Sequence, residues 1–200
     1  MDLLQLYKHL RKKHGKQGWW PLMEGELTYS GESPSNEQRF EVAVGCVLAQ
    51  NTQFHPNVEE SLKNLHKANM LNPLAIKEID IDELAKLVEP SGYKNKKAKY
   101  LKNLTDFFLS EKEVTRENLL EVKGIGKETA DSILLYAFDE LEFVIDKYTK
   151  DFLKRNDYYF KDDYDKIKAL VEESIPKNIT VYKEFHALIV QEGKVYKSEN

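Results

Sequence analysis

The sequence has one cysteine and no long hydrophobic run, and both absences exclude classes of protein. Cys46 alone can form neither an internal disulfide nor a zinc or iron–sulfur site with four thiolate ligands. The apolar runs, such as 42–49, are much shorter than a membrane-spanning helix requires. The first residues lack the apolar segment and cleavage site of a signal peptide. We therefore expect a cytoplasmic protein that does not associate with a membrane.

Basic residues are fewer than acidic ones, but the charges are separated along the chain. The 200 residues include 30 Lys and Arg and 34 Asp and Glu, which gives a net charge of −4. Five lysines lie within 94–102, whereas acidic residues are concentrated in 78–89 and 157–173. A nucleic-acid-binding face needs only a local excess of positive charge, so the acidic total does not exclude one.

Alternation with a period of two is almost absent, and apolar residues recur at helical spacing through most of the chain. The only strand-like piece is 143–145, and 15–36 is expected to be an ordered loop. We predict an all-α fold of two helical lobes with a cleft between them. A central bundle of 37–140 would form one lobe, and 1–36 together with 141–200 would form the other. The expected helices are one that ends before Gly15 and those over 37–49, 56–68, 80–88, 93–109, 115–121, 128–138, 147–155, 162–174 and 178–196.

Two glycines one residue apart, Gly124 and Gly126, lie between two predicted helices. They allow a tight hairpin whose backbone amides are not covered by side chains, while Ile125 would anchor the hairpin in the core. Together with the positive end of the following helix, these amides form a site for an anion such as a DNA phosphate. A simple turn between two helices would use the same glycines, and this alternative stays open.

Asp146 follows the apolar piece 143–145 and precedes a helix that begins at Lys147. An acidic residue at this place is ordinarily a helix N-cap. A capped and partly buried carboxylate also has the fixed geometry that electrostatic catalysis requires, so the two roles are compatible.

The segment from Leu119 to Asp146 resembles the helix-hairpin-helix DNA glycosylases of the endonuclease III superfamily. The shared pattern is Leu-x-x-Val-x-Gly-Ile-Gly-x-x-Thr-Ala-Asp, followed by an apolar piece and Val-Ile-Asp. Further similarity is found in 47–52, 92–98 and 185–190, so the resemblance covers about 37–192. It implies a monomer, located at the nucleoid, that binds double-stranded DNA containing a damaged base and uses Asp146 for catalysis.

The resemblance also implies which residues contact the DNA backbone. Val122, Gly124, Gly126 and Lys127 would bind phosphate at the hairpin, where a monovalent cation can sit when DNA is bound. Lys94, Lys96 and Lys97 are further candidates, although lysines on an exposed helix face are more often simply solvated. No other cofactor and no protein metal site are implied.

Two departures from the family pattern narrow the expected activity. Members that also cut the strand carry a lysine two residues after the second hairpin glycine, and its amine attacks the sugar. Here that position is Glu128, and Lys127 is rotated by about 100° on the helix. No cysteine follows His186, so the family's iron–sulfur cluster is not expected. With 18–21 and 50–54, these departures resemble the small bacterial type of monofunctional 3-methyladenine DNA glycosylase.

A base in duplex DNA must be rotated out of the stack before an enzyme can act on it. Trp19, Trp20, Pro21 and Phe54 offer flat faces for stacking, and electron-rich rings favour a cationic purine. Two tryptophans in a loop are also common as core anchors. Gln50 or Asn51 would fill the gap in the duplex through amide hydrogen bonds, or would merely cap a helix.

The predicted function is therefore hydrolysis of the N-glycosidic bond of alkylated bases in base excision repair, without lyase activity. A non-catalytic helix-hairpin-helix module that only grips DNA would share the hairpin, as would a glycosylase and lyase for oxidised or mismatched bases. We expect a structural role for Asp131, a packing role for His186, and a solvated helix face for the acidic residues of 162–173.

Overall fold

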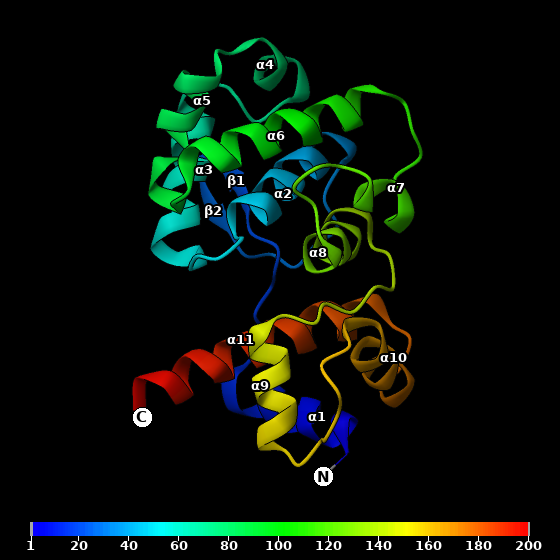
Figure 1. Ribbon diagram of the computed structural model, residues 1–200. Helices are drawn as coiled ribbons and strands as arrows, with labels where there is room; N and C mark the ends of the chain where they lie inside the picture. Colours follow the sequence, from blue (N-terminus) through cyan, green and yellow to red (C-terminus); the bar gives the residue numbers. More distant parts are fainter. Residues whose placement is uncertain (1, 200) are drawn as a thin grey trace.

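Most of the regular structure is helical, as the sequence predicts. The computed structural model describes residues 2–199, and within this range it contains eleven α-helices, two short helical turns and one antiparallel β-hairpin (Figure 1). The α-helices are α1 (Leu3–His14), α2 (Asn36–Leu48), α3 (Glu59–Lys67), α4 (Pro73–Glu78), α5 (Ile81–Leu87), α6 (Lys94–Leu109), α7 (Arg116–Leu120), α8 (Lys127–Phe138), α9 (Lys147–Arg155), α10 (Tyr164–Ser174) and α11 (Ile179–Glu199). The short turns are η1 (Phe54–Val58) and η2 (Glu89–Ser91), and the strands are β1 (Leu22–Glu24) and β2 (Glu26–Thr28).

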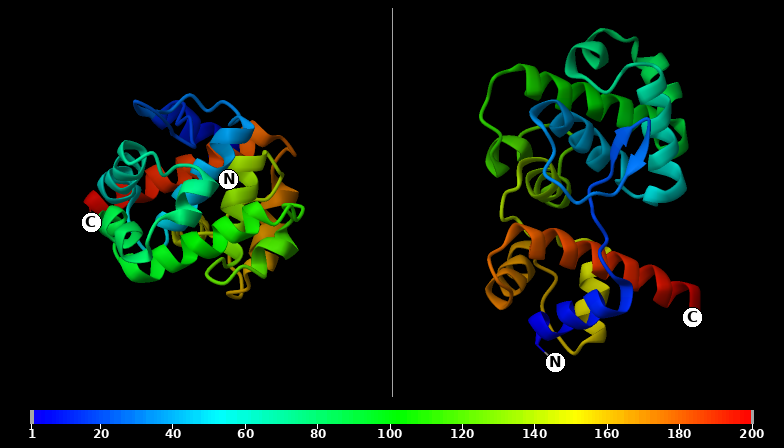
Figure 2. Two further views of the ribbon diagram at one scale, coloured as in Figure 1. Left: turned by 90° about the horizontal axis from the view of Figure 1, so that it is seen from above. Right: turned by 180° about the vertical axis from the view of Figure 1, so that it is seen from behind.

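The helices form two lobes, which confirms the predicted architecture. Figures 1 and 2 show α2–α8 in one lobe and α1, α9, α10 and α11 in the other. In the first lobe α2 packs against α6 and α8, and in the second α1 and α9 pack against α11. The chain crosses between the lobes twice, once before β1 and once after α8. Both ends of the described chain therefore belong to the same lobe.

The first lobe begins earlier in the chain than the predicted boundary at 37. The β1–β2 hairpin packs on α2 and α3, and the Met23 amide donates a 2.6 Å hydrogen bond to Oε1 of Glu41 on α2. The hairpin was expected to be an irregular part of the second lobe. It was missed because each strand has only three residues, too few for an alternating pattern to be visible.

The piece 143–145 is extended but pairs with no strand in the described part of the chain. Side chains of α10 bond its backbone instead: the Phe143 amide donates to Oε1 of Glu172 at 2.7 Å, and the Ile145 amide donates to the Tyr164 hydroxyl at 3.3 Å. These contacts fix the strand-like segment that leads into Asp146.

A cluster of charged side chains joins the lobes on the side of α8 that faces α10. Asp131 of α8 is fully buried, with Oδ1 2.6 Å from Nε of Arg116 and Oδ2 3.3 Å from Nζ of Lys168. Arg116 also bonds Oδ1 of Asp165 at 3.0 Å. Asp131 is thus structural, as expected. Asp165 and Glu172, in contrast, do not belong to a purely solvated face, because they bond residues of other segments.

Candidate active site

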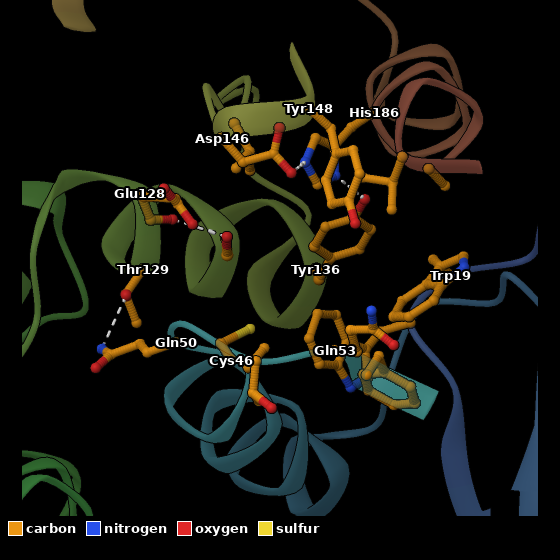
Figure 3. A pocket seen from close by; sticks show the side chains of 18 of the residues that line it. Trp19, Cys46, Gln50, Gln53, Glu128, Thr129, Tyr136, Asp146, Tyr148 and His186 are labelled. Atoms are coloured by element: carbon orange, nitrogen blue, oxygen red, sulfur yellow. Dashed lines mark hydrogen bonds and ion pairs between the residues drawn. The ribbon is translucent and has the colours of Figure 1, made fainter. Parts of the chain in front are cut away.

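A pocket lies at the junction of the two lobes (Figure 3). It is lined by the end of α2 and one face of α8 from the first lobe, and by the start of α9 and one face of α11 from the second. Trp19 and Trp20, on the segment that crosses between the lobes, complete the wall. Residues more than 160 positions apart in the sequence therefore meet around one cavity.

Asp146 is the N-cap of α9, and its carboxyl group lines the pocket. Oδ1 accepts a 2.7 Å hydrogen bond from the Thr149 amide, and Oδ2 lies 3.5 Å from Nε2 of His186. Burial raises the pKa of this carboxyl group, but the hydrogen bond and charge of His186 and the Thr149 amide outweigh burial, so the pKa of Asp146 lies below its usual value. The structure thus combines a helix cap with an ionised carboxylate held in a fixed position.

His186 contacts the pocket through both ring nitrogens. Nε2 faces Asp146, and Nδ1 lies 2.7 Å from the Tyr136 hydroxyl, which is also 3.3 Å from the Lys183 carbonyl. The hydroxyl can therefore bond both the imidazole and the carbonyl, and these contacts fix the orientation of the ring beside Asp146. The expected packing role is incomplete, because His186 also positions Asp146.

Three aromatic rings form an edge-to-face cluster at the opposite wall. Ring centroids of Trp19 and Phe54 lie 4.6 Å apart, those of Trp20 and Phe54 5.4 Å, and those of the two tryptophans 5.3 Å. All three line the pocket. Pro21, predicted beside them, is buried but does not line the pocket.

The side chain of Gln50 is turned toward the hairpin and the start of α8. Its Nε2 donates to the Gly124 carbonyl at 2.9 Å and to Oγ1 of Thr129 at 3.0 Å. Both donor hydrogens are used, so the side chain joins α2 to the hairpin and lines the pocket, and duplex insertion by Gln50 stays a prediction. Asn51 is exposed in the following turn, with a φ of 55°, and stays a candidate for that role.

The hairpin of Val122–Lys127 has the geometry that its glycines predict. Gly124 has a φ of 107°, and a Cβ atom there would lie 2.2 Å from the Tyr100 ring. Ile125 is 6% exposed and anchors the hairpin in the core. The first main-chain bond of α8 runs from the Ala130 amide to the Gly126 carbonyl at 2.8 Å, so the preceding amides lie at the open N-terminus of the helix.

The predicted phosphate-binding lysines differ in position. Lys127 pairs with Asp165, Lys94 pairs with Glu89, and Nζ of Lys96 lies 5.6 Å above the Tyr100 ring. Lys97 is buried, and Nζ donates to the carbonyls of Leu48 at 2.7 Å and Ser91 at 2.6 Å. Burial lowers the pKa of Lys97 to about 8. This lysine therefore supports the fold, and its predicted phosphate contact is wrong.

Several pocket residues were not predicted from the sequence. On α8 they are Thr129, Ser132 and Tyr136, and elsewhere they include Tyr148 and Lys194. Lys194 follows His186 and Val190 at intervals of four, so these three lie on one face of α11. The spacing of four residues can be read from the sequence and places the three side chains on one face of α11. It does not indicate a functional site until the fold shows that this face borders the pocket.

Within residues 2–199 no three or more His, Cys, Asp or Glu side chains are grouped so that they could hold a metal ion. Within the same range, none of the helices combines the length and the hydrophobicity that a membrane span requires.

Residues 44–177 match the HhH-GPD superfamily of base excision DNA repair proteins, a span that includes the hairpin, Glu128 and Asp146. The chain belongs to this superfamily. Over 97% of its length the HhH-GPD chain is 39% identical to a candidate DNA repair glycosylase of Methanocaldococcus jannaschii, of which it covers 88%. The resemblance drawn from the sequence motifs is therefore confirmed.

Solved structures of the HhH-GPD superfamily share the two-lobed fold. The H. pylori 3-methyladenine DNA glycosylase bound to 1,N6-ethenoadenine superposes with a TM-score of 0.82 and 33% identity, over 98% of this chain and 99% of that one. An endonuclease III–DNA complex superposes with a TM-score of 0.74 over 93% of this chain and 81% of that one, but at 18% identity. The second likeness concerns the fold alone.

Proposed function

We propose that this protein is a monofunctional DNA glycosylase that releases alkylated purines from double-stranded DNA by hydrolysis. The observation that carries the proposal is the position of Asp146: an ionised carboxylate, fixed by Thr149 and His186, lines the same pocket as the rings of Trp19, Trp20 and Phe54. The aromatic wall can stack on a rotated purine, and the carboxylate can stabilise the positive charge that develops on the sugar.

An alkylated substrate suits this pocket for two reasons. A purine alkylated at N3 or N7 is positively charged, so its glycosidic bond breaks readily and needs only modest catalysis. The faces of the indole rings also attract a cation. The likeness to the H. pylori 3-methyladenine glycosylase, which holds an ethenoadenine in its structure, supports the same substrate class.

The positions of the lysines support hydrolysis without strand cleavage. Glu128 occupies the place of the family's nucleophilic lysine, and a carboxylate cannot form an imine with the sugar. Lys127 is paired with Asp165 of α10 and does not line the pocket. Among the residues that line the pocket, Lys194 is the only lysine, and it lies beyond His186 and Val190 on α11.

Trapping with borohydride distinguishes hydrolysis from lyase chemistry. We expect no covalent adduct between the wild-type protein and DNA, since Glu128 and not a lysine occupies the position of the family's nucleophile. Glu128→Lys, which restores an amine at the family's position, should give a trapped adduct and serves as the positive control. An adduct with the wild-type protein that disappears in Lys194→Met would show that Lys194 is a nucleophile and would refute the monofunctional proposal.

Release of free bases tests the catalytic role of Asp146. DNA treated with a methylating agent should release methylated purines with the wild-type protein, and Asp146→Asn should slow release about 100-fold or more. Asp157→Asn is the matched control, because Asp157 is exposed just beyond the other end of α9. Undiminished release by Asp146→Asn would refute the assignment. If only uracil, oxidised or mismatched substrates are processed, the substrate class is wrong; if none is processed, the protein is a DNA-binding module.

The hairpin provides the proposed contact with the DNA backbone. Its amides at the start of α8 suit a phosphate. The Val122 carbonyl accepts one hydrogen bond, from the Ile125 amide at 2.9 Å, and its second lone pair is of the kind that binds a hard cation. The carbonyl of Gly124 is already used by Gln50, so a monovalent cation bound with DNA would rely on Val122 and its neighbours in the turn.

A further inference from the structure

Two carboxyl groups, not one, line the pocket. Glu128 is in the first turn of α8, and Asp146 caps α9, so they come from different lobes (Figure 3). Glu128, Ser132 and Tyr136 follow one another at intervals of four residues and all line the cavity. Lys127 and Asp131 lie on the other side of α8 and pair with residues of α7 and α10. The register of the helix therefore directs Glu128 toward the pocket.

The two carboxyl groups have different surroundings. Asp146 is fixed by the Thr149 amide and His186, whereas no hydrogen bond fixes the Glu128 carboxyl group among the described residues. Glu128 as a whole is an exposed residue at the pocket, although neighbouring groups surround its carboxyl group. A water molecule can therefore reach Glu128 while Asp146 faces the pocket from the opposite lobe.

We propose that Glu128 is the general base of the reaction and accepts a proton from the water that attacks the sugar, while Asp146 stabilises the positive charge of the sugar without taking the proton. This assignment rests on the proposed glycosylase function. His186 is a poor alternative, since one ring nitrogen faces Asp146 and the other bonds Tyr136.

The pKa values of the two carboxyl groups agree with these different roles. Four titratable groups face Glu128 from the neighbouring elements: Asp146, Lys150 of α9, His186 of α11 and Tyr164 of α10. Packing around the carboxyl group and repulsion from Asp146 raise the pKa of Glu128 to about 6, although His186 and Lys150 act in the opposite direction. The pKa of Asp146 is lowered. Two carboxyl groups whose environments separate their pKa values in this way are suited to different roles.

The step balances as a hydrolysis. The oxygen of water forms a bond to C1′ as the bond from C1′ to the purine nitrogen breaks, and the electron pair of that bond leaves with the purine. For a cationic alkylated purine, the departing base is neutral. The proton lost by water passes to the Glu128 carboxylate and from there to solvent.

The same side chain should weaken DNA binding. Glu128 is beside the proposed phosphate-binding amides of the hairpin, and a negative charge there repels the DNA backbone. Removing the charge should therefore tighten binding while slowing chemistry. Substitution of a residue with a purely structural role would not tighten DNA binding and slow base release at the same time.

The test compares Glu128→Gln with the wild-type protein on methylated DNA under single-turnover conditions. We expect release about 100-fold slower, with DNA affinity unchanged or higher. In the wild-type protein, the rate of base release measured at protein concentrations too low to saturate the DNA should rise with pH through about 6, where Glu128 ionises, and then level off. This rise should be absent in Glu128→Gln and present, with a lower plateau, in Glu128→Asp. Glu121→Gln, a removal of an exposed charge near the hairpin, is the matched control and should keep the wild-type rate and pH profile.

The outcomes separate this inference from the proposed function. If Glu128→Gln keeps the wild-type rate and pH profile while Asp146→Asn is impaired, the protein is a glycosylase and Glu128 is not its base. If the wild-type protein releases no base from any substrate, the proposed function itself is wrong. Circular dichroism and thermal unfolding of each variant show whether a lost rate reflects a lost fold.

Discussion

At the scale of single residues, buried charges decide both the stability of the fold and the division of roles among acidic side chains. Asp131, Asp146 and Glu128 are all acidic residues of one short stretch, yet the first is enclosed by cations, the second caps a helix at a pocket, and the third is open to solvent. Their surroundings, and not their residue type, determine what each can do.

Replacing Asp131 should strongly destabilise the protein. Asp131→Asn leaves Arg116 and Lys168 without their shared buried partner, and breaking such a group by removing one member typically costs about 3–5 kcal/mol. Urea unfolding followed by circular dichroism measures the change. Asp165→Asn removes a half-exposed partner of the same arginine and should cost less than about 1 kcal/mol. Equal decreases in the free energy of unfolding of the two variants would contradict this account of the cluster.

The sequence predicted the position of Asp146 but not its neighbours. Asp146 could be identified because a helix cap and a family motif are local patterns. His186 is 40 residues away and meets Asp146 only because α9 and α11 pack together. Lys96 and Lys97 show the same limit: they differ by one position on α6, and which of them is buried depends on the elements that pack there, such as the end of α2.

At the scale of elements, the hairpin between α7 and α8 combines a structural requirement with a proposed binding role. Gly124 has a positive φ and lies against Tyr100, while a Cβ atom on Gly126 would meet open space. The first glycine is thus required for packing, and the second leaves the start of α8 accessible.

Alanine substitutions should separate these two requirements. Gly124→Ala should lower the free energy of unfolding by about 1–3 kcal/mol and weaken DNA binding, because the added methyl group collides with Tyr100 and disfavours the backbone conformation. Gly126→Ala should change stability by no more than about 1 kcal/mol. Chemical unfolding and fluorescence anisotropy with a DNA duplex measure the two quantities. If Gly126→Ala were the more damaging for stability, the assignment would be reversed.

Elements longer than two turns were predicted well because helical periodicity is visible over such lengths. The segments that were missed are short: the β1–β2 hairpin and α4. Asn72 is the N-cap of helix α4: its side chain accepts a 2.8 Å hydrogen bond from the Ala75 amide, and Pro73 is the first residue of the helix. Asn72 and Pro73 are a local sequence signal for the start of a helix. A helix of only six residues, however, shows too little apolar periodicity to be predicted from the sequence.

At the scale of the whole molecule, an acidic protein must bind DNA through a limited basic surface. The net charge is −4, and Lys97, one member of the lysine-rich stretch, is not available because it is buried. Binding should therefore depend on a few exposed lysines and on the hairpin amides.

The salt dependence of DNA affinity tests this view. Lys127→Ala should reduce the slope of log K against log salt concentration by about 0.9, the value for one lost phosphate contact. Lys97→Met, a substitution in the same predicted set, should leave the slope unchanged and lower stability instead. Titrations with a DNA duplex at several salt concentrations give both slopes. A lower slope in Lys97→Met would place its amine at the DNA despite its burial.

One contact on α2 positions a ring of the pocket wall. Gly45 lies against the Trp20 ring, and a Cβ atom there would be 2.9 Å from the indole. The indole can sink into the helix surface only because position 45 has no side chain. Under the proposed function, a methyl group at position 45 is expected to push the indole toward the pocket and reduce the space for a base, without altering any group that takes part in the chemistry.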